Sequence, residues 1–347
     1  MATLTSLPEV SLADWDDPAT DRRAFAGRVA DICHEVGFFT LVDHGIGQST
    51  IDGYMSMVRR FFALPDDVKA TIEKVHSPHC RGWERLGSEL TDNKVDHREQ
   101  VDLWTERVAL EPSVLPAYRR LVGPNPWLSD DALPGFRSVV SSWFATMESL
   151  AGRLMEVLAV GLGLPGHAFH DIFGPETHSL LKLIHYPPTP AGAAGVNGHH
   201  DSGFLTILLQ HEVGGLQVRT QQGEWIDVAP QRGAFNVNLG EMLQAMTGNY
   251  YVATMHKVVS DAERYSSAFF HGPSLDTPLA PVDLEPRYAA RVAASEYHRS
   301  TGFMARREQL LAGEAGTSAT AVDTYGDQLW NYFLRSYPDI IAARFVS

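Results

Sequence analysis

Between residues 179 and 270 the chain contains a series of short apolar segments, and this pattern limits the possible folds more than any other feature of the sequence. The segments are rich in branched and aromatic residues, and Gly, Pro, Asn or Asp separates each from the next. Short strands that alternate with such turns are typical of a β-sandwich or jelly roll. The predicted strands cover residues 180–186, 204–209, 216–219, 225–228, 235–238, 251–254 and 267–270.

Helical patterns flank this strand-rich region on both sides. The predicted helices cover residues 18–37, 48–62, 124–164 and much of 286–347, with a break at 313–320, and further strands are predicted at 8–12 and 38–42. No low-complexity linker separates the regions, so we expect an α+β fold with a mainly β core, a double-stranded β-helix (jelly roll) with flanking helices. The expected organisation is one compact domain (1–347) with an N-terminal α/β portion (1–178), a jelly-roll core (179–275) and a C-terminal helical cap (276–347).

Charge and cysteine content restrict the partners and the compartment. A formal net charge of −14 argues against non-specific binding to nucleic acid or anionic membranes, because both need a basic surface. Two cysteines, Cys33 and Cys80, are too few for a disulfide framework. The first residues lack the features of a signal peptide, and no apolar run approaches the roughly 20 residues that span a bilayer. We expect a cytoplasmic protein with a small-molecule partner and no nucleic-acid or membrane partner; the composition does not indicate an oligomeric state.

A histidine and a carboxylate precede the predicted strand at 204–209. On a strand, His199 and Asp201 would project to one face and His200 to the other. His256, which we expect on a later strand, could supply a second imidazole. Two histidines and one carboxylate on one side of a metal are the facial arrangement of non-haem Fe(II) oxygenases, which leaves positions open for substrate and O2. No thiolate lies nearby to favour a structural zinc, so the sequence predicts an Fe(II) site.

An arginine and a serine follow His256 at a short distance along the chain. A turn at Ser260-Asp261 would bring Arg264 back on a neighbouring strand, about 5 Å away, with Ser266 on the same face. The guanidinium group can bind a carboxylate through two parallel hydrogen bonds, and the serine hydroxyl adds a donor. The residues after Ser266 have the composition of an interior strand, and a buried arginine requires an anion. The pair is therefore a candidate carboxylate-binding site.

Further motifs occur in a fixed order along nearly the whole chain. They are Gly37-Phe38-Phe39, Asp43-His44-Gly45-Ile46, Phe61-Phe62-Ala63-Leu64-Pro65, His185-Tyr186-Pro187-Pro188, Gly214-Gly215-Leu216-Gln217-Val218 and Val237-Asn238-Leu239-Gly240. With the His/Asp and Arg/Ser pairs, they resemble the isopenicillin-N-synthase-like Fe(II)/2-oxoglutarate-dependent dioxygenases. The C-terminal segments Tyr325-Gly326-Asp327 and Arg335-Ser336-Tyr337-Pro338-Asp339 are most similar to the bacterial ethylene-forming branch of that family.

The resemblance implies a metal site, a cosubstrate site and a reaction. The implied Fe(II) ligands are His199, Asp201 and His256. The residues implied to bind 2-oxoglutarate are Arg264, Ser266 and Tyr186. With O2, such an enzyme hydroxylates or otherwise oxidises a small molecule and releases succinate and CO2. Two alternatives stay open: an Fe(II) oxidase of the same fold that uses no 2-oxoglutarate, as isopenicillin N synthase does, and a non-catalytic metal-binding jelly roll, which would need no anion clamp.

The stretch from residue 74 to residue 107 is polar, bears several aromatic residues and lacks a clear period, as surface loops and functional lids do. We expect it to form the substrate pocket together with the C-terminal helices. Lys182 stands where the family often has Arg, pointing at this pocket. The candidate substrate-contacting residues are Arg81, Trp83, Glu89, Lys182, Phe270 and Arg335. The charged members indicate an amino-acid-like or carboxylate-bearing substrate.

Overall fold

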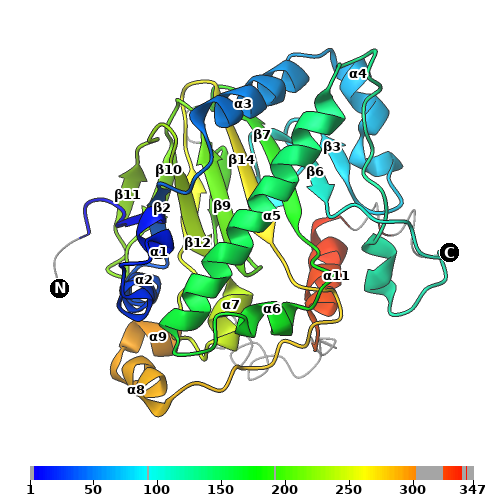
Figure 1. Cartoon of the computed structure of the whole chain (residues 1–347). Coiled ribbons are helices and arrows are strands. Elements are labelled where there is room, and N and C mark those ends of the chain that lie inside the picture. Colours follow the sequence, from blue (N-terminus) through cyan, green and yellow to red (C-terminus); the bar gives the residue numbers. More distant parts are fainter. Residues whose placement is uncertain (1–3, 92–93, 191–192, 302–322, 338–340, 342–347) are drawn as a thin grey trace.

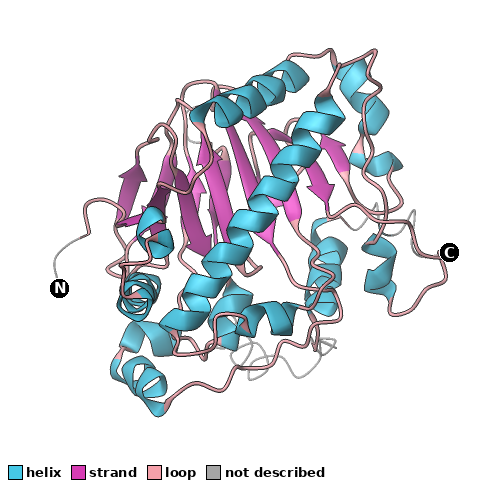
Figure 2. Ribbon diagram, in the orientation of Figure 1, coloured by secondary structure: helices cyan, strands magenta, loops and turns pink. Residues whose placement is uncertain are grey.

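The structure, a computed structural model, describes residues 4–91, 94–190, 193–301, 323–337 and 341. Two β-sheets form its centre and helices surround them, as the colouring in Figure 2 shows. The 26-residue helix α5 (Phe136–Gly161) crosses one face of the larger sheet diagonally (Figure 1) and buries one side along its length. The predicted jelly-roll core with flanking helices is confirmed.

The larger sheet has eight strands, and its outer strands come from the N-terminal part of the chain. In spatial order they are β1 (Glu9–Ser11), β2 (Phe38–Val42), β12 (Phe235–Leu239), β9 (Leu205–Gln210), β14 (Arg264–His271), β7 (Leu180–Tyr186), β6 (Glu99–Trp104) and β3 (Gly82–Glu84). Only the β1–β2 pair is parallel among these described strands. Segments far apart in sequence thus extend both edges of the jelly-roll sheet.

The smaller sheet carries two of the predicted metal ligands. Its four strands, in order, are β11 (Trp225–Val228), β10 (Leu216–Arg219), β13 (His256–Val258) and β8 (Val196–His199). Ile184 and Ala268 of the larger sheet share one apolar cluster with Val196 and Val258 of the smaller sheet, so the two sheets pack face to face. A separate hairpin joins β4 (Leu90–Thr91) to β5 (Lys94–Val95).

Helices cover the sheets from several parts of the chain. Besides α5 they are α1 (Ala13–Asp16), α2 (Arg22–Glu35), α3 (Gln48–Phe62), α4 (Asp66–Lys69), α6 (Ala168–Phe173), α7 (Glu241–Met246), α8 (Pro286–Ala294), α9 (Glu296–Ser300) and α11 (Tyr325–Ser336), with 3-10 turns at Ala70–Ile72, Lys74–His76 and Ala117–Leu121. The Asp21 side chain caps α2, and Thr324 and Asp327 form a capping box at the start of α11. No helix in the described ranges is long and apolar enough to cross a membrane.

One predicted helix has different bounds in the structure, and one predicted strand does not form. The helix expected at 124–164 begins only at Phe136, because the preceding segment contains Pro124, Pro126 and Pro134, which do not fit a helix interior. The strand expected at 251–254 does not form, because Val252 N–H donates to a carbonyl of α2 and Ala253 N–H donates to the Gln244 side chain. The break expected at 313–320 lies outside the described residues.

Five of the described strands were not predicted: β3, β4, β5, β6 and β8. Strand β6 lies within the stretch interpreted as a polar loop, yet all six of its residues are buried. The strand was not recognised in the sequence because it contains polar residues, whereas a fully buried strand normally has a continuous apolar sequence. Strand β8 contains Asn197 and Gly198, which have low strand propensity.

The expected placement of Arg264 beside His256 on a neighbouring strand is wrong. Strand β13 pairs with β10 and β8 in the smaller sheet, whereas β14 pairs with β7 and β9 in the larger one. The turn at Ser260-Asp261 therefore takes the chain from one sheet to the other, and facing sheets lie about 10 Å apart. Arg264 approaches the metal ligands from the opposite layer of the sandwich.

Candidate metal and cosubstrate site

The two predicted histidine ligands lie opposite each other on neighbouring strands. His199 at the end of β8 pairs in register with His256 at the start of β13, and their ring centroids are 4.3 Å apart. Asp201 follows β8 and places Oδ1 3.6 Å from Nε2 of His199 and 3.7 Å from Nε2 of His256. One ligand atom from each of the three lies within 4.8 Å of the others. The spacing in sequence becomes a compact cluster in space.

Hydrogen bonds orient all three side chains toward a common point. Nδ1 of His199 donates to the Asn197 carbonyl at 2.8 Å, and Nδ1 of His256 donates to the Thr254 carbonyl at 3.1 Å. A carbonyl only accepts, so each Nε2 keeps its lone pair free for a metal. Two imidazoles and a hard carboxylate fit Fe(II), as the facial donor set requires.

The Asp201 carboxylate is held by its other oxygen. Oδ2 accepts hydrogen bonds from Thr206 Oγ1 at 2.5 Å and from Asn238 Nδ2 at 2.6 Å, which leaves Oδ1 toward the histidines. Burial by itself raises the pKa of Asp201, but His256, His199 and Thr206 outweigh it and the pKa is lowered. Burial, followed by the nearby His199, lowers the pKa of His256 to about 4. The carboxylate is therefore ionised and His256 neutral near neutral pH.

Arg264 lies on the inner face of the larger sheet with no exposed surface. Its Nη1 donates to Ser266 Oγ at 3.0 Å and its Nη2 to Gln210 Oε1 at 3.2 Å, and its guanidinium carbon lies 4.7 Å from the Tyr186 ring centroid. Within the described part of the chain no carboxylate forms an ion pair with Arg264, and its Nε has no partner. Burial lowers the pKa of this arginine. A buried guanidinium with only neutral partners fits an external anion.

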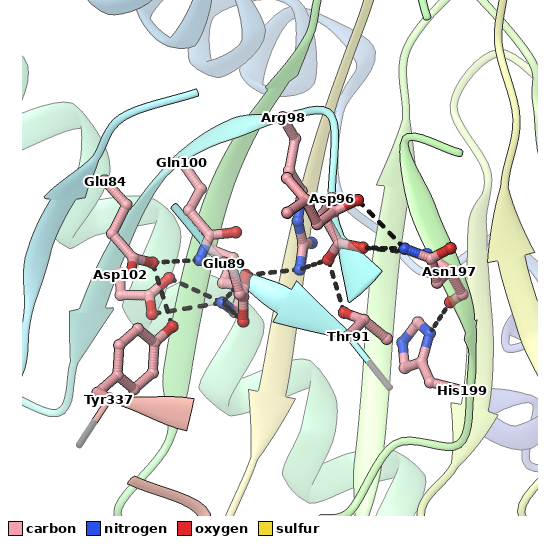
Figure 3. Close-up of polar contacts among 12 residues, drawn as sticks. Glu84, Glu89, Thr91, Asp96, Arg98, Gln100, Asp102, Asn197, His199 and Tyr337 are labelled. Carbon is pink, nitrogen blue, oxygen red and sulfur yellow. Dashed lines mark hydrogen bonds and ion pairs between the residues drawn. The ribbon is translucent and has the colours of Figure 1, made fainter. Parts of the chain in front are cut away.

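A second polar region occupies the inner side of β7, β6 and β3. We define the charge cluster as seven buried charged residues: Lys74, Glu84, Glu89, Asp96, Arg98, Asp102 and Lys182. Figure 3 shows its carboxylates and Arg98 in a row with Gln100 and Tyr337, leading toward His199. Strands β7 and β6 place Lys182 directly opposite Asp102, and β3 adds Glu84 beside Gln100. The cluster therefore combines both signs of charge in one interior strip.

Short ion pairs connect the members of the charge cluster. Lys74 Nζ lies 2.8 Å from Glu84 Oε2 and 2.6 Å from Asp102 Oδ2. Lys182 Nζ lies 3.1 Å from Asp102 Oδ1 and 3.4 Å from Glu89 Oε2. Burial raises the pKa of Glu84, against the effect of Lys74. Every cation in the cluster thus has at least two carboxylate neighbours.

Two of the six predicted substrate residues belong to the charge cluster. Lys182 and Glu89 contact each other, and Glu89 also accepts from Tyr332 of α11 at 3.1 Å. Phe270 lies partly buried on β14, two residues beyond Ala268 on the same face, where it packs against the apolar cluster between the sheets. Residues from the 74–107 stretch and from α11 thus meet in one interior region.

The other three predicted residues are not brought into this cluster. Arg81 is fully buried and donates to the carbonyls of residues 105, 121 and 123 and to Asn125, which gives it a structural role. Trp83 packs in the core and donates to Glu99 at 2.9 Å. Arg335 is exposed on the last turn of α11. A charged or aromatic side chain in the sequence was therefore not enough to predict that these three residues lie at the charge cluster.

Several cluster members were not singled out from the sequence. Asp102 and its neighbour Gln100 lie two residues apart and project to one face of β6, and Arg98 precedes the strand with the same spacing. This period of two in polar residues is the signal that could have identified them. It is weak, because the same alternation is normal on a solvent-exposed strand face.

A jelly roll with two histidines and a carboxylate at the end of paired strands, and with a buried arginine facing them, defines the class of non-haem Fe(II) oxygenases. A family model described as the N-terminal region of non-haem dioxygenases in morphine synthesis matches residues 7–130, and the model of the 2OG-Fe(II) oxygenase superfamily matches residues 177–273. The chain belongs to the 2OG-Fe(II) oxygenase superfamily.

Individual relatives agree with this assignment. A 2-oxoglutarate-dependent dioxygenase of Dothideomycetidae sp. is 37% identical over 262 residues, which cover 72% of this chain and 70% of that protein. A homoarginine-6-hydroxylase of Oryza sativa is 30% identical over 294 residues, 82% of this chain and 84% of that protein. The crystal structure of JOX2 in complex with 2OG, Fe and JA is similar with a TM-score of 0.66 and 32% identity, over 80% of this chain and 78% of that one. The protein is a non-haem oxygenase that uses Fe(II), 2-oxoglutarate and O2.

Proposed function

We propose that His199, Asp201 and His256 ligate Fe(II), and that Arg264 and Ser266 bind the distal carboxylate of 2-oxoglutarate above the Tyr186 ring. The observation that carries this proposal is the buried guanidinium of Arg264, which has no carboxylate partner in the described part of the chain and faces the sheet that bears the histidines. A dicarboxylate that reaches from the metal to Arg264 would supply the missing counter-charge.

When bound, the iron and 2-oxoglutarate supply the activation of O2, with release of succinate and CO2 and oxidation of a small-molecule substrate. The residues of this chain hold and orient these partners. Thr206 and Asn238 fix the Asp201 carboxylate, and Gln210 fixes the Arg264 guanidinium. The packed apolar residues between the sheets exclude water from the reaction.

The proposed substrate is an amino-acid-like or carboxylate-bearing small molecule held at the charge cluster. Carboxylates and cations alternate there, so the cluster can recognise a molecule that carries both charges. Arg98 Nε, a donor, and Gln100 Oε1, an acceptor, are buried without a partner among the described residues, and a polar ligand would satisfy both. The name of the homoarginine-6-hydroxylase relative supports an amino-acid-like substrate.

The first experiment measures cosubstrate binding. Fe(II) and 2-oxoglutarate added without oxygen should give the visible charge-transfer band of their complex, and Asp201→Ala should abolish it. A screen of amino acids, including homoarginine, and of other carboxylates should then find compounds that stimulate succinate release. No band with the unmodified protein would overturn the proposed site, and stimulation only by uncharged compounds would overturn the proposed substrate class.

We also propose a family branch, a cellular compartment and a domain organisation for this protein. The C-terminal segments that begin at Tyr325 and Arg335 support a position near the bacterial ethylene-forming branch, although Pro338-Asp339 lie outside the described residues. The buried free thiols of Cys33 and Cys80 are consistent with the cytoplasm. One apolar cluster that contains Val10, Leu181 and Ile341 supports the single domain over residues 1–347.

A further inference from the structure

One residue, Asn197, connects the proposed iron ligand His199 to the charge cluster. Its carbonyl accepts the Nδ1 hydrogen of His199 at 2.8 Å. Its main-chain N–H and its side-chain Nδ2 both donate to Asp96 Oδ1, at 3.1 and 3.0 Å. The residue whose carbonyl orients the histidine is therefore held by a buried carboxylate through its own N–H and its side chain (Figure 3).

The Asp96 carboxylate is itself rigidly held. It has no exposed surface, and its second oxygen accepts from Thr91 Oγ1 at 2.6 Å and from Arg98 Nη2 at 3.1 Å. Arg98 Nη2 also lies 2.6 Å from Glu89 Oε2. With four donors on two oxygens, Asp96 ties β8 to the β4–β5 hairpin and to the rest of the charge cluster. The rigidity of a buried, fully bonded carboxylate is transmitted to the strand it holds.

The other histidine has no such support. Nδ1 of His256 donates to the Thr254 carbonyl, and Thr254 Oγ1 donates to the carbonyl of Val36. No charged side chain takes part in these contacts. The two imidazoles are thus oriented in different ways, one through a carboxylate network and one through neutral groups.

We propose that Asp96 is a positioning residue for iron: through Asn197 it fixes the orientation of His199 and so strengthens Fe(II) binding. This inference rests on the proposed ligand set. Outer partners of metal-bound histidines commonly change metal affinity by about 10- to 100-fold. Because Asp96 acts through a main-chain carbonyl, its effect on His199 is one of geometry, and the cosubstrate contacts of Arg264 are untouched.

The test uses the full chain and anaerobic Fe(II) titration with saturating 2-oxoglutarate, followed by the charge-transfer band. Asp96→Asn should weaken Fe(II) binding about tenfold and shift the band, whereas the apparent affinity for 2-oxoglutarate at saturating Fe(II) should stay within about twofold. Asn197→Ala, at a partly exposed position, removes one of the two hydrogen bonds that Asn197 donates to Asp96 and should weaken Fe(II) binding about threefold. It provides the test if Asp96→Asn does not fold.

The matched control is Tyr337→Phe, which removes a buried hydroxyl that contacts Lys74 and Glu84 at the far end of the charge cluster. Its Fe(II) affinity should equal that of the unmodified chain. Unchanged Fe(II) binding in a folded Asp96→Asn variant, or equal weakening by Tyr337→Phe, would overturn the positioning role. Failure of the unmodified chain to bind Fe(II) would instead refute the proposed ligand set.

Discussion

The interior of the larger sheet holds buried positive charge in two different settings. Lys74 lies within 3 Å of both Glu84 and Asp102, so its charge is compensated inside the protein. Arg264 is equally buried, yet only neutral groups contact it in the described part of the chain. Burial of an unpaired charge costs several kcal/mol, whereas a pair recovers much of that cost. The first setting therefore supports the fold, and the second supports the binding of an anion.

The largest expected effect follows from removing the cation that compensates two buried carboxylates. Lys74→Met should lower the free energy of unfolding by about 3–5 kcal/mol, because Glu84 and Asp102 would be left buried without their shared cation. Urea unfolding of the metal-free protein measures this loss. Arg264→Met is the matched variant and should leave the free energy of unfolding unchanged or raise it by up to several kcal/mol, since it removes a buried charge that has no counter-charge and no buried carboxylate loses a partner. Equal losses in the two variants would contradict the comparison.

The next effect concerns cosubstrate binding. Arg264→Ala should raise the dissociation constant of 2-oxoglutarate about 100-fold, because the carboxylate loses two charge-assisted hydrogen bonds at a buried site. Arg264→Lys should restore part of the affinity, since it keeps the charge and loses the planar fork. Anaerobic titration of the charge-transfer band measures both. A dissociation constant within threefold of the unmodified value in Arg264→Ala would remove Arg264 from the cosubstrate site.

The dependence of stability on pH sharpens the description of the charge cluster. Burial raises the pKa of Glu89, but Arg98 and Lys182 outweigh it, so the pKa in the folded protein lies below the ordinary 4.5. Below pH 4.5 the unfolded chain binds a proton at Glu89 that the folded chain does not bind. The stabilising contribution is therefore present above pH 4.5 and is lost as the pH falls further.

Glu89→Gln should remove this part of the acid dependence. The slope of unfolding free energy against pH, measured with urea between pH 3 and 6, should be smaller in the variant by up to about 1.4 kcal/mol per pH unit. Glu212→Gln, which changes an exposed carboxyl, serves as the control and should leave the slope as it is. An identical slope in Glu89→Gln and the unmodified protein would contradict the prediction that the pKa of Glu89 is lower in the folded chain than in the unfolded chain.

The smallest expected effect distinguishes the contribution of the Tyr186 hydroxyl to 2-oxoglutarate binding from that of its ring. The ring lies under the Arg264 guanidinium, so Tyr186→Phe keeps this contact and loses only the hydroxyl. The dissociation constant of 2-oxoglutarate should rise about threefold, the scale of one neutral hydrogen bond. A hundredfold rise would instead give the hydroxyl a direct contact with the cosubstrate, and Arg264 would no longer be its main anchor.

The fold class could be predicted because strand and turn signals in the core are local. Short segments such as 216–219 and 225–228 matched the observed strands, since branched residues and Gly-rich turns act over a few positions. Strand β6 could not be found in this way. Its buried Glu99 and Asp102 are stabilised by Lys69 and Lys74, and those partners come from another part of the chain.

The sequence by itself determined the chemistry available at the site. The sequence supplies His199 and Asp201 two residues apart, and Arg264 and Ser266 share a face because side chains alternate along a strand. The tertiary structure decided which layer each pair occupies and which buried charges find a counter-charge. The physical reason is range: side-chain alternation is a property of a few neighbouring residues, whereas compensation of a buried charge depends on contacts such as Lys74 with Asp102 and Asp96 with Asn197, which only the folded chain brings together.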